Sequence, residues 1–178
     1  MANPQLKEFL KRNEESLENY QAPPLMRDLV TMIPESGTIC IIEVTCSDAR
    51  VDPRDYFGLK YGEALVIRNA GGRAVDAYRS LEVMGTIAPI GLIIVVHHTD
   101  CGAVFTTEEE VRSKLSHRTP AHAASTKDKW FGTFRDIGLD ESIRQDMEEL
   151  KRWPFLPAET QIVGYALDLE TGTMREVA

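Results

Sequence analysis

The sequence predicts an α/β fold, with a mostly parallel central sheet of four strands plus a short edge strand and helices on both faces. Short runs of β-branched and aliphatic residues recur along the chain, and segments with helical spacing of apolar residues separate them. Strands that alternate with helices are typical of parallel sheets. The 178 residues, 43% of them hydrophobic, are enough for one sizeable core. We therefore expect a single domain over residues 1–178.

Five segments have the apolar, β-branched composition of strands. The third is the most apolar, and the last is short and follows a turn that contains Gly172. The expected strands are residues 38–45, 63–68, 91–97, 161–167 and 173–177.

Three helices are expected between the strands, at residues 74–87, 104–115 and 140–153. Asp140 is the expected N-cap of the last helix, and Pro154 stops that helix. Thr99 and Asp100 are expected to cap the helix that follows the third strand. The polar and weakly patterned residues 117–129 are expected to form a surface loop.

The first 34 residues are expected to form a helical arm. Apolar or aromatic residues at positions 6, 9, 10, 17 and 20 have helical spacing, and two prolines at 23–24 end that segment. A second short helix is expected over residues 25–33, before Pro34. Because both helices precede the first strand, this arm (residues 1–34) can dock on a partner subunit instead of on its own core.

The charge of the chain limits its partners. Twenty Lys and Arg residues and 28 Asp and Glu residues give a formal net charge of −8, which disfavours nucleic acid and anionic membrane surfaces. No apolar run approaches the roughly 20 residues of a membrane helix. The N-terminus is too rich in charged residues for a secretory signal or a transit peptide. We expect a cytoplasmic protein that binds neither nucleic acid nor membrane.

Two short motifs contain the residues most suited to chemistry. The sequences CSDAR and HTDC each follow an expected strand, and open parallel sheets bind ligands beyond the carboxyl ends of their strands. Cys46, His98 and Cys101 offer two thiols and an imidazole, which are donors that zinc prefers. The chain has no C-x-x-C pair of the kind common in structural zinc sites. Three firm ligands, with Asp48 or a water in the fourth position, indicate a catalytic zinc, one per subunit.

Asp48 and Arg50 would serve that metal. A carboxylate beside the metal can accept a hydrogen bond from the reacting water, and the planar guanidinium can hold the carboxylate in place. If the pair failed, Asp48 could bind the metal and block the site. The alternative is an ordinary surface ion pair, worth under about 1 kcal/mol. The remaining cysteine and histidines are interpreted as ordinary core or surface residues: Cys40, His97, His117 and His122.

At these motifs the sequence resembles the β-class carbonic anhydrases. CSDAR matches the family's C-x-D-x-R motif, and HTDCG matches its H-x-x-C-G motif. The intervening segments GEA and RNAGG are similar to the family's second strand and the loop after it, and the agreement extends from about residue 38 to residue 104. The resemblance implies a homodimer, alone or paired into a dimer of dimers, in which the N-terminal helices wrap the neighbouring subunit.

The resemblance also implies roles for individual residues. Cys46, His98 and Cys101 would bind zinc. Asp48 and Arg50 would form the gating dyad. The implied reaction is the attack of zinc-bound hydroxide on a linear, weakly polar carbon electrophile.

Three positions depart from the plant-type members of the family. Gly37, Leu65 and Val83 stand where those members have glutamine, phenylalanine and tyrosine. With Gly102 of the second motif, these residues are the expected substrate pocket. Loss of an amide donor weakens the hold on a bicarbonate-like product, and smaller side chains make room for sulfur. The departures match a short subgroup that is similar to both carbonic anhydrases and carbonyl sulfide hydrolases.

Four functions are compatible with parts of this pattern. The first is reversible hydration of carbon dioxide to bicarbonate, and the second is hydrolysis of carbonyl sulfide, or of carbon disulfide, at the same zinc. The third is a zinc-stabilised interaction module without catalysis. The fourth, a cysteine-dependent phosphatase, needs an arginine six residues after Cys46, but position 52 is an aspartate that repels phosphate. The RNAGG segment lacks the spacing of a nucleotide-binding motif and is expected to form a tight loop near the site or the dimer interface.

Overall fold

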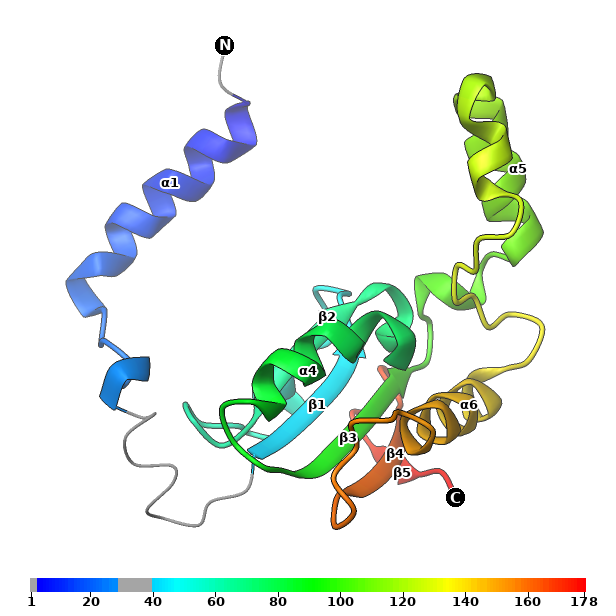
Figure 1. Ribbon diagram of the computed structural model, residues 1–178. Coiled ribbons are helices and arrows are strands. Elements are labelled where there is room, and N and C mark those ends of the chain that lie inside the picture. The colour runs from blue at the N-terminus through cyan, green and yellow to red at the C-terminus, as the bar shows by residue number, and fades with distance from the viewer. Residues whose placement is uncertain (1–2, 29–39) are drawn as a thin grey trace.

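The computed structural model describes residues 3–28 and 40–178, which contain one five-stranded sheet (Figure 1). The strand order is β2-β1-β3-β4-β5. Strands β1 to β4 are parallel, and β5 pairs antiparallel with β4 at the edge. The strands are β1 (Cys40–Cys46), β2 (Leu65–Asn69), β3 (Ile90–His98), β4 (Gln161–Leu167) and β5 (Met174–Glu176). This is the mostly parallel α/β fold that the sequence predicts.

The strands extend further toward the two motifs than the sequence indicates. β1 continues to Cys46 and β3 to His98, so the first residue of each motif belongs to the sheet. β4 has the predicted bounds, and β2 and β5 lie within two residues of theirs. The predicted start of the first strand, residue 38, lies outside the described residues. The sheet itself therefore fixes the backbone of two of the three expected metal ligands.

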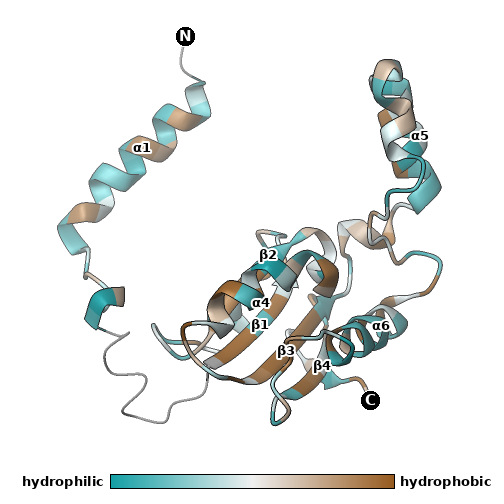
Figure 2. Cartoon of the chain, in the orientation of Figure 1, coloured by the Kyte–Doolittle hydropathy of each residue, from teal (hydrophilic) through white to brown (hydrophobic). Residues whose placement is uncertain are grey.

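Helices α4 (Tyr78–Gly85) and α6 (Leu139–Lys151) cover one face of the sheet. Their buried residues Leu81, Ile143 and Leu150 pack into the main core. Alternate residues of β1 and β3 point toward this face, and the hydrophobic character of both strands is visible in Figure 2. The buried strand residues in this core are Ile42, Val44, Ile90, Ile93, Val95 and Ala166.

The opposite face has a thinner cover. Its one-turn helix α3 (Pro53–Tyr56) packs beside a smaller cluster centred on Val51, Val96 and Leu167. β1 also places the fully buried Glu43 on this side, next to a cavity of about 230 Å³. Both faces carry helices, as predicted, but among the described residues the helix that packs on the second face is the single turn α3.

The helices after β2 and before β4 differ in detail from the prediction. Residues 74–87 form a 3-10 helix, η3 (Ala74–Ala77), which is followed by α4. The N-cap of α6 is Gly138, with φ of 83°, so the prediction of Asp140 as its cap is wrong. The glycine allows a sharp entry into the helix that most side chains disfavour. Asp140 lies in the first turn and accepts hydrogen bonds from Arg175, the shorter at 2.6 Å.

The region after β3 also differs. The helix predicted over 104–115 is α5 (Glu108–Arg118), because Thr107 caps it by accepting a backbone N–H at 3.1 Å. Residues 117–129, predicted as a loop, contain the 3-10 helix η5 (Pro120–Thr126). Together α5 and η5 project away from the sheet (Figure 1).

The N-terminal arm stands apart from the sheet (Figure 1). Helix α1 (Pro4–Ser16) and the short η1 (Leu17–Asn19) have no buried residue. Of the second predicted helix, residues 26–28 are helical, and the remainder lies outside the described residues. None of the described helices has both the length and the apolar composition that crossing a bilayer requires. The apolar side chains of the arm are exposed: Leu6, Phe9, Leu10, Leu17 and Tyr20.

Candidate metal centre

Two neighbouring parallel strands bring the two motifs together. Cys46 is the last residue of β1, His98 is the last residue of β3, and the two strands pair directly. Cys101 follows in the turn after β3. Two Sγ atoms and one ring nitrogen lie within 4.8 Å of one another, and all three residues are buried. The three side chains form the cluster that could hold a metal ion within the described part of the chain.

His98 presents an unpaired nitrogen to this cluster. Its Nδ1–H donates to the carbonyl oxygen of Thr99 at 2.8 Å, which places the proton on Nδ1. Nε2 is buried and has no hydrogen-bond partner among the described residues. A buried nitrogen in this state is unfavourable unless another group uses its lone pair. Metal-binding histidines are oriented in the same way, with the second nitrogen donating to a carbonyl or carboxylate oxygen.

The two thiols lie side by side without a disulfide. The Sγ atoms of Cys46 and Cys101 are 3.8 Å apart, whereas a disulfide bond is about 2.05 Å long. The hydrogen bond between the thiols lowers the pKa of Cys46 far below its usual range and raises the pKa of Cys101. Loss of both protons therefore needs a compensating positive charge. Two thiolates and a neutral imidazole are donors that suit Zn²⁺, so the residues fit this ion.

Asp48 lies two residues after Cys46, the first of the expected ligands, and is held by Arg50. Arg50 Nη2 and Nε donate to its carboxylate at 2.7 and 3.1 Å, and the backbone N–H of Arg50 donates to Oδ1 at 2.9 Å. These hydrogen bonds keep the pKa of Asp48 well below its usual range, so the carboxylate is ionised. The predicted pair is thus present, and the carboxylate expected as an alternative fourth ligand is engaged by the guanidinium.

The prediction that Thr99 and Asp100 cap a helix is wrong. The next helix is the three-residue η4 (Gly102–Val104), and its N-cap is Cys101, without a side-chain hydrogen bond. Asp100 Oδ2 instead accepts a hydrogen bond from Arg50 Nη1 at 2.6 Å, and Thr99 Oγ1 accepts one from the loop after β4. Both residues stand in the two motifs, but their pairing follows from the position of β1 beside β3 and not from the motifs alone.

The RNAGG segment supports the first motif. Arg68 donates hydrogen bonds to three carbonyl oxygens around that motif, those of Cys46, Asp48 and Val51. Gly72, with φ of 72°, lies so close to the end of β1 that a Cβ would be 3.0 and 3.1 Å from two backbone atoms. Arg68 and Asn69 end β2, and the rest of the segment forms a tight 3-10 turn at the site, η2 (Ala70–Gly72), as the predicted tight loop requires. The three hydrogen bonds of Arg68 are made with the protein's own backbone.

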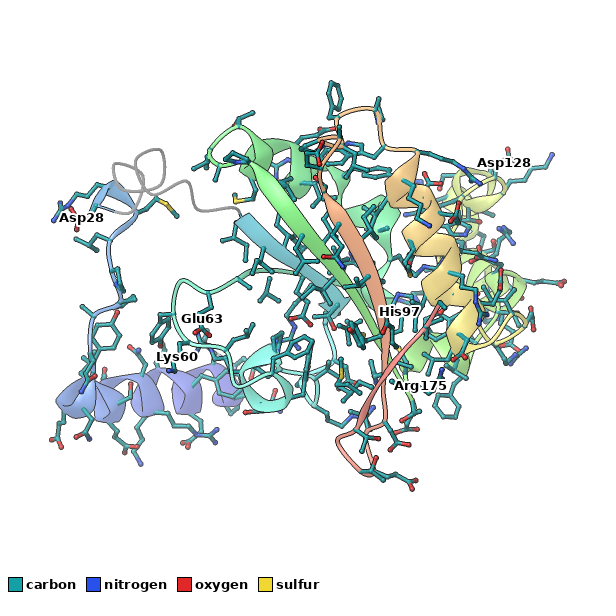
Figure 3. All side chains as sticks on the ribbon, turned by 90° about the horizontal axis from the view of Figure 1, so that it is seen from below. Asp28, Lys60, Glu63, His97, Asp128 and Arg175 are labelled. Atoms are coloured by element: carbon teal, nitrogen blue, oxygen red, sulfur yellow. The ribbon has the colours of Figure 1, made fainter. Side chains whose placement is uncertain are left out.

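His97, labelled in Figure 3, belongs to a buried polar network that links the sheet to α6. His97 Nδ1 is 2.7 Å from Ser142 Oγ, and its Nε2 is 3.1 Å from Asp146, which also pairs with the buried Arg73 at 3.0 Å. The ring of His97 stacks on Phe134, which packs against Cys46 and Cys101. His97 is a core histidine, as interpreted from the sequence. The sequence did not indicate its partners, because they come from distant segments.

The residues expected to form the substrate pocket are spread over several elements. Leu65 lies at the amino end of β2, whose carboxyl end pairs with Cys46, so the length of the strand separates the two. Val83 is exposed on α4, and Gly102 directly follows the last ligand. Gly37 lies outside the described residues. The assignment of these four residues to a pocket stays a prediction.

The fold and the cluster together define a class: an α/β protein with a candidate metal centre at the carboxyl edge of a parallel sheet. Residues 41–174 match the family model for carbonic anhydrase. The beta-carbonic anhydrase 1 of Mycobacterium tuberculosis is 30% identical over 171 residues, which cover 96% of each chain. The chain therefore belongs to the β-carbonic anhydrase family, as its motifs indicate.

Relatives with similar sequence identity to this chain are named for two different activities, carbonic anhydrase and carbon disulfide hydrolase. A carbon disulfide hydrolase of Acidianus sp. is 31% identical over 188 residues, covering 95% of this chain and 89% of the relative. Among solved structures, a carbonic anhydrase of Streptococcus mutans has a TM-score of 0.81 and 32% identity over the full length of both chains. A carbon disulfide hydrolase in its apo form has a TM-score of 0.68 and 28% identity, covering 96% and 91%. Membership of the family is shown, whereas the activities named within it differ.

Proposed function

We propose that the protein is a zinc enzyme that catalyses the reversible hydration of carbon dioxide, CO₂ + H₂O ⇌ HCO₃⁻ + H⁺. The observation that supports this most directly is the buried set of two sulfur atoms and an unpaired imidazole nitrogen beside a carboxylate held by arginine. Cys46, His98 and Cys101 would hold the ion. Bound zinc supplies Lewis-acid chemistry, which makes a water acidic enough to act as a nucleophile near neutral pH.

Asp48 would orient the reacting water. Because its carboxylate is ionised, it accepts a hydrogen bond from that water and so directs the oxygen lone pair toward the carbon of the substrate. Arg50 holds the carboxylate through hydrogen bonds from its Nε, its Nη2 and its backbone N–H. Two thiolate ligands leave little net positive charge at the metal, so orientation by Asp48 matters more than at a site with three histidines.

Carbon dioxide hydration by the purified, zinc-loaded protein tests this proposal. Asp48→Ala should remain folded and metal-loaded and should lose about 100-fold or more in kcat/KM, because a positioned proton acceptor contributes at least that much. Asp136→Ala, which changes a mostly exposed aspartate outside both motifs, is the matched control and should keep full activity. Asp48→Ala with wild-type activity, or a folded and zinc-loaded wild type without any activity, would favour the interaction module.

Hydrolysis of carbonyl sulfide or carbon disulfide is the second candidate. It is favoured by the relatives named carbon disulfide hydrolase and by the small residues Leu65 and Val83 at expected pocket positions. The reactions are COS + H₂O → CO₂ + H₂S and CS₂ + 2 H₂O → CO₂ + 2 H₂S. The same preparation should be given each substrate while sulfide release is measured. We expect slower turnover than with carbon dioxide, and a sulfide-releasing kcat/KM equal to or above that for carbon dioxide would reverse the order of the two candidates.

The proposal includes one zinc ion per subunit and a homodimer, alone or paired into a dimer of dimers. Support for the dimer comes from the apolar side of α1, none of whose residues is buried within the described part of the chain. The cytoplasmic location stays a prediction from the composition of the chain.

A further inference from the structure

Arg50 is shared between two carboxylates. Its Nε and Nη2 donate to Asp48 at 3.1 and 2.7 Å, while Nη1 donates to Asp100 Oδ2 at 2.6 Å. Nη2 also donates to the backbone carbonyl oxygen of Asp100 at 3.0 Å. A guanidinium is rigid and planar, so contacts on two sides fix its orientation better than contacts on one. The dyad of Asp48 and Arg50 is therefore part of a trio.

Asp100 joins the two segments that carry the metal-binding residues. Arg50 lies in the segment that follows Cys46, and Asp100 lies between His98 and Cys101. Asp100 has φ of 54°, and the described residues include no other non-glycine residue with positive φ. Aspartate and asparagine tolerate this left-handed conformation better than most residues. In this conformation both the carboxylate and the carbonyl oxygen of Asp100 contact Arg50.

We propose that Asp100 is a positioning residue that holds Arg50 against Asp48 and so keeps Asp48 away from the open coordination position of the metal. This inference rests on the proposed metal centre and deepens it. The ionised Asp48 can have two partners, the guanidinium of Arg50 and a divalent cation. Loss of Asp100 frees one side of the guanidinium, loosens its hold on Asp48 and shifts the balance toward the cation.

Loss of Asp100 should change the affinity of an added anion for the metal moderately, and the direction of that change distinguishes two explanations. The side chains of Arg50 and Asp100 are both more than half exposed, and exposed ion pairs contribute little individually, so we expect about a fivefold change. If Asp100 acted only through its negative charge, its loss would make an added anion bind more tightly at the metal. Competition from a released Asp48 would make the same anion bind more weakly.

Azide binding to the cobalt(II)-substituted protein measures this competition, because the visible spectrum of cobalt reports on its ligands. In Asp100→Asn, which keeps the tolerance for positive φ, we expect the Kd of azide to rise about fivefold. In an Asp48→Asn background the same change should not weaken azide binding, because the competing carboxylate is absent. Asp140→Asn is the matched control. It breaks an ion pair with Arg175 that is also 2.6 Å long but outside both motifs, and it should leave the Kd unchanged.

Tighter or unchanged azide binding in a folded, cobalt-loaded Asp100→Asn protein would overturn the proposal. If that variant fails to fold, Asp100→Gly, which also permits positive φ, should give the same weakening of azide binding. Failure of the metal centre itself would look different. The wild-type protein would then take up no cobalt, or would show none of the intense absorption of cobalt-bound thiolates, and this result would overturn both the centre and the role of Asp100.

Discussion

Cys101 allows a direct test of the proposed centre, because one atom can be exchanged with little change in shape. Cys101→Ser replaces a buried sulfur by oxygen, a donor that zinc prefers less. We expect the variant to fold but to bind zinc more than about 100-fold more weakly, since loss of a ligand exceeds the effect of losing an outer contact. Zinc per chain after dialysis against a chelator measures this. Cys40→Ser, at the cysteine with no expected ligand role, should retain the metal, and stoichiometric zinc in Cys101→Ser would contradict the centre.

The same residues show which contacts can be predicted from sequence. Asp48 and Arg50 are two positions apart, so their pairing is a local property of the motif. The contact of Arg50 with Asp100 spans fifty positions and exists only because β1 and β3 are neighbours in the sheet. A neighbouring pair of strands has to be known before such a contact can be inferred. Local chemistry at the site was therefore predictable, and its long-range support was not.

Secondary structure was predictable where burial imposes a pattern. The strands are buried between layers, so their apolar runs mark them, and β4 has the predicted bounds. Helix α5 has no buried residue, so the sequence holds no apolar periodicity to locate its start. Its start depends on the hydrogen bond that the Thr107 hydroxyl accepts from the backbone N–H of Glu110, and several polar residues nearby could have served as the cap. Exposed elements are thus the ones whose bounds the sequence left open.

A buried titratable side chain of strand β1, Glu43, contacts Tyr56 of helix α3. Glu43 is fully buried, one of its oxygens accepts a hydrogen bond from the hydroxyl of Tyr56, and the other has no partner among the described residues. Burial raises the pKa of Glu43 to about 7, although the hydrogen bond from Tyr56 and the charge of Arg68 act in the opposite direction. We therefore expect the stability of the packing between these two elements to depend on pH near neutrality.

The free energy of unfolding should depend on whether Glu43 is protonated. Between the ordinary pKa near 4.5 and the folded value of about 7, the folded state keeps a proton that the unfolded chain releases. Stability from this group is therefore present at low pH and is lost as pH rises through that window. Glu43→Gln removes the titration. Relative to wild type, it should gain up to about 3 kcal/mol in unfolding free energy between about pH 5 and about pH 8.

Denaturant unfolding of both proteins at several pH values measures this gain, and taking the difference cancels the other titrating groups. Tyr56→Phe provides a second variant. It removes a donor that stabilises the ionised carboxylate, so the loss of stability should move to higher pH. A difference between Glu43→Gln and wild type that stays constant across the range would contradict the assignment.

At the scale of the whole molecule, two apolar surfaces are left uncovered by residues 3–28 and 40–178. The side of α1 that carries Phe9 and Leu10 is exposed, with 59% and 56% of these residues accessible. The less covered face of the sheet has a cavity lined largely by apolar side chains such as Ile41, Leu92 and Ile94. Exposed apolar surface of this extent on separate elements is typical of chains that associate. A second copy of the chain offers both surfaces at once, and this argument supports the proposed homodimer.

Charges placed on the arm should therefore separate the subunits. In Phe9→Glu combined with Leu10→Glu, burial of the apolar side of α1 against a partner becomes unfavourable. We expect the Kd of the dimer to rise by at least about 100-fold, because each apolar side chain contributes roughly 2 kcal/mol when buried. Analytical ultracentrifugation over a range of concentrations measures the change. Lys11→Ala, on the polar side of the same helix, should remain dimeric. If the double variant has the same Kd as the wild type, α1 does not form the interface, and a wild type that stays monomeric at high concentration would remove the dimer from the proposal.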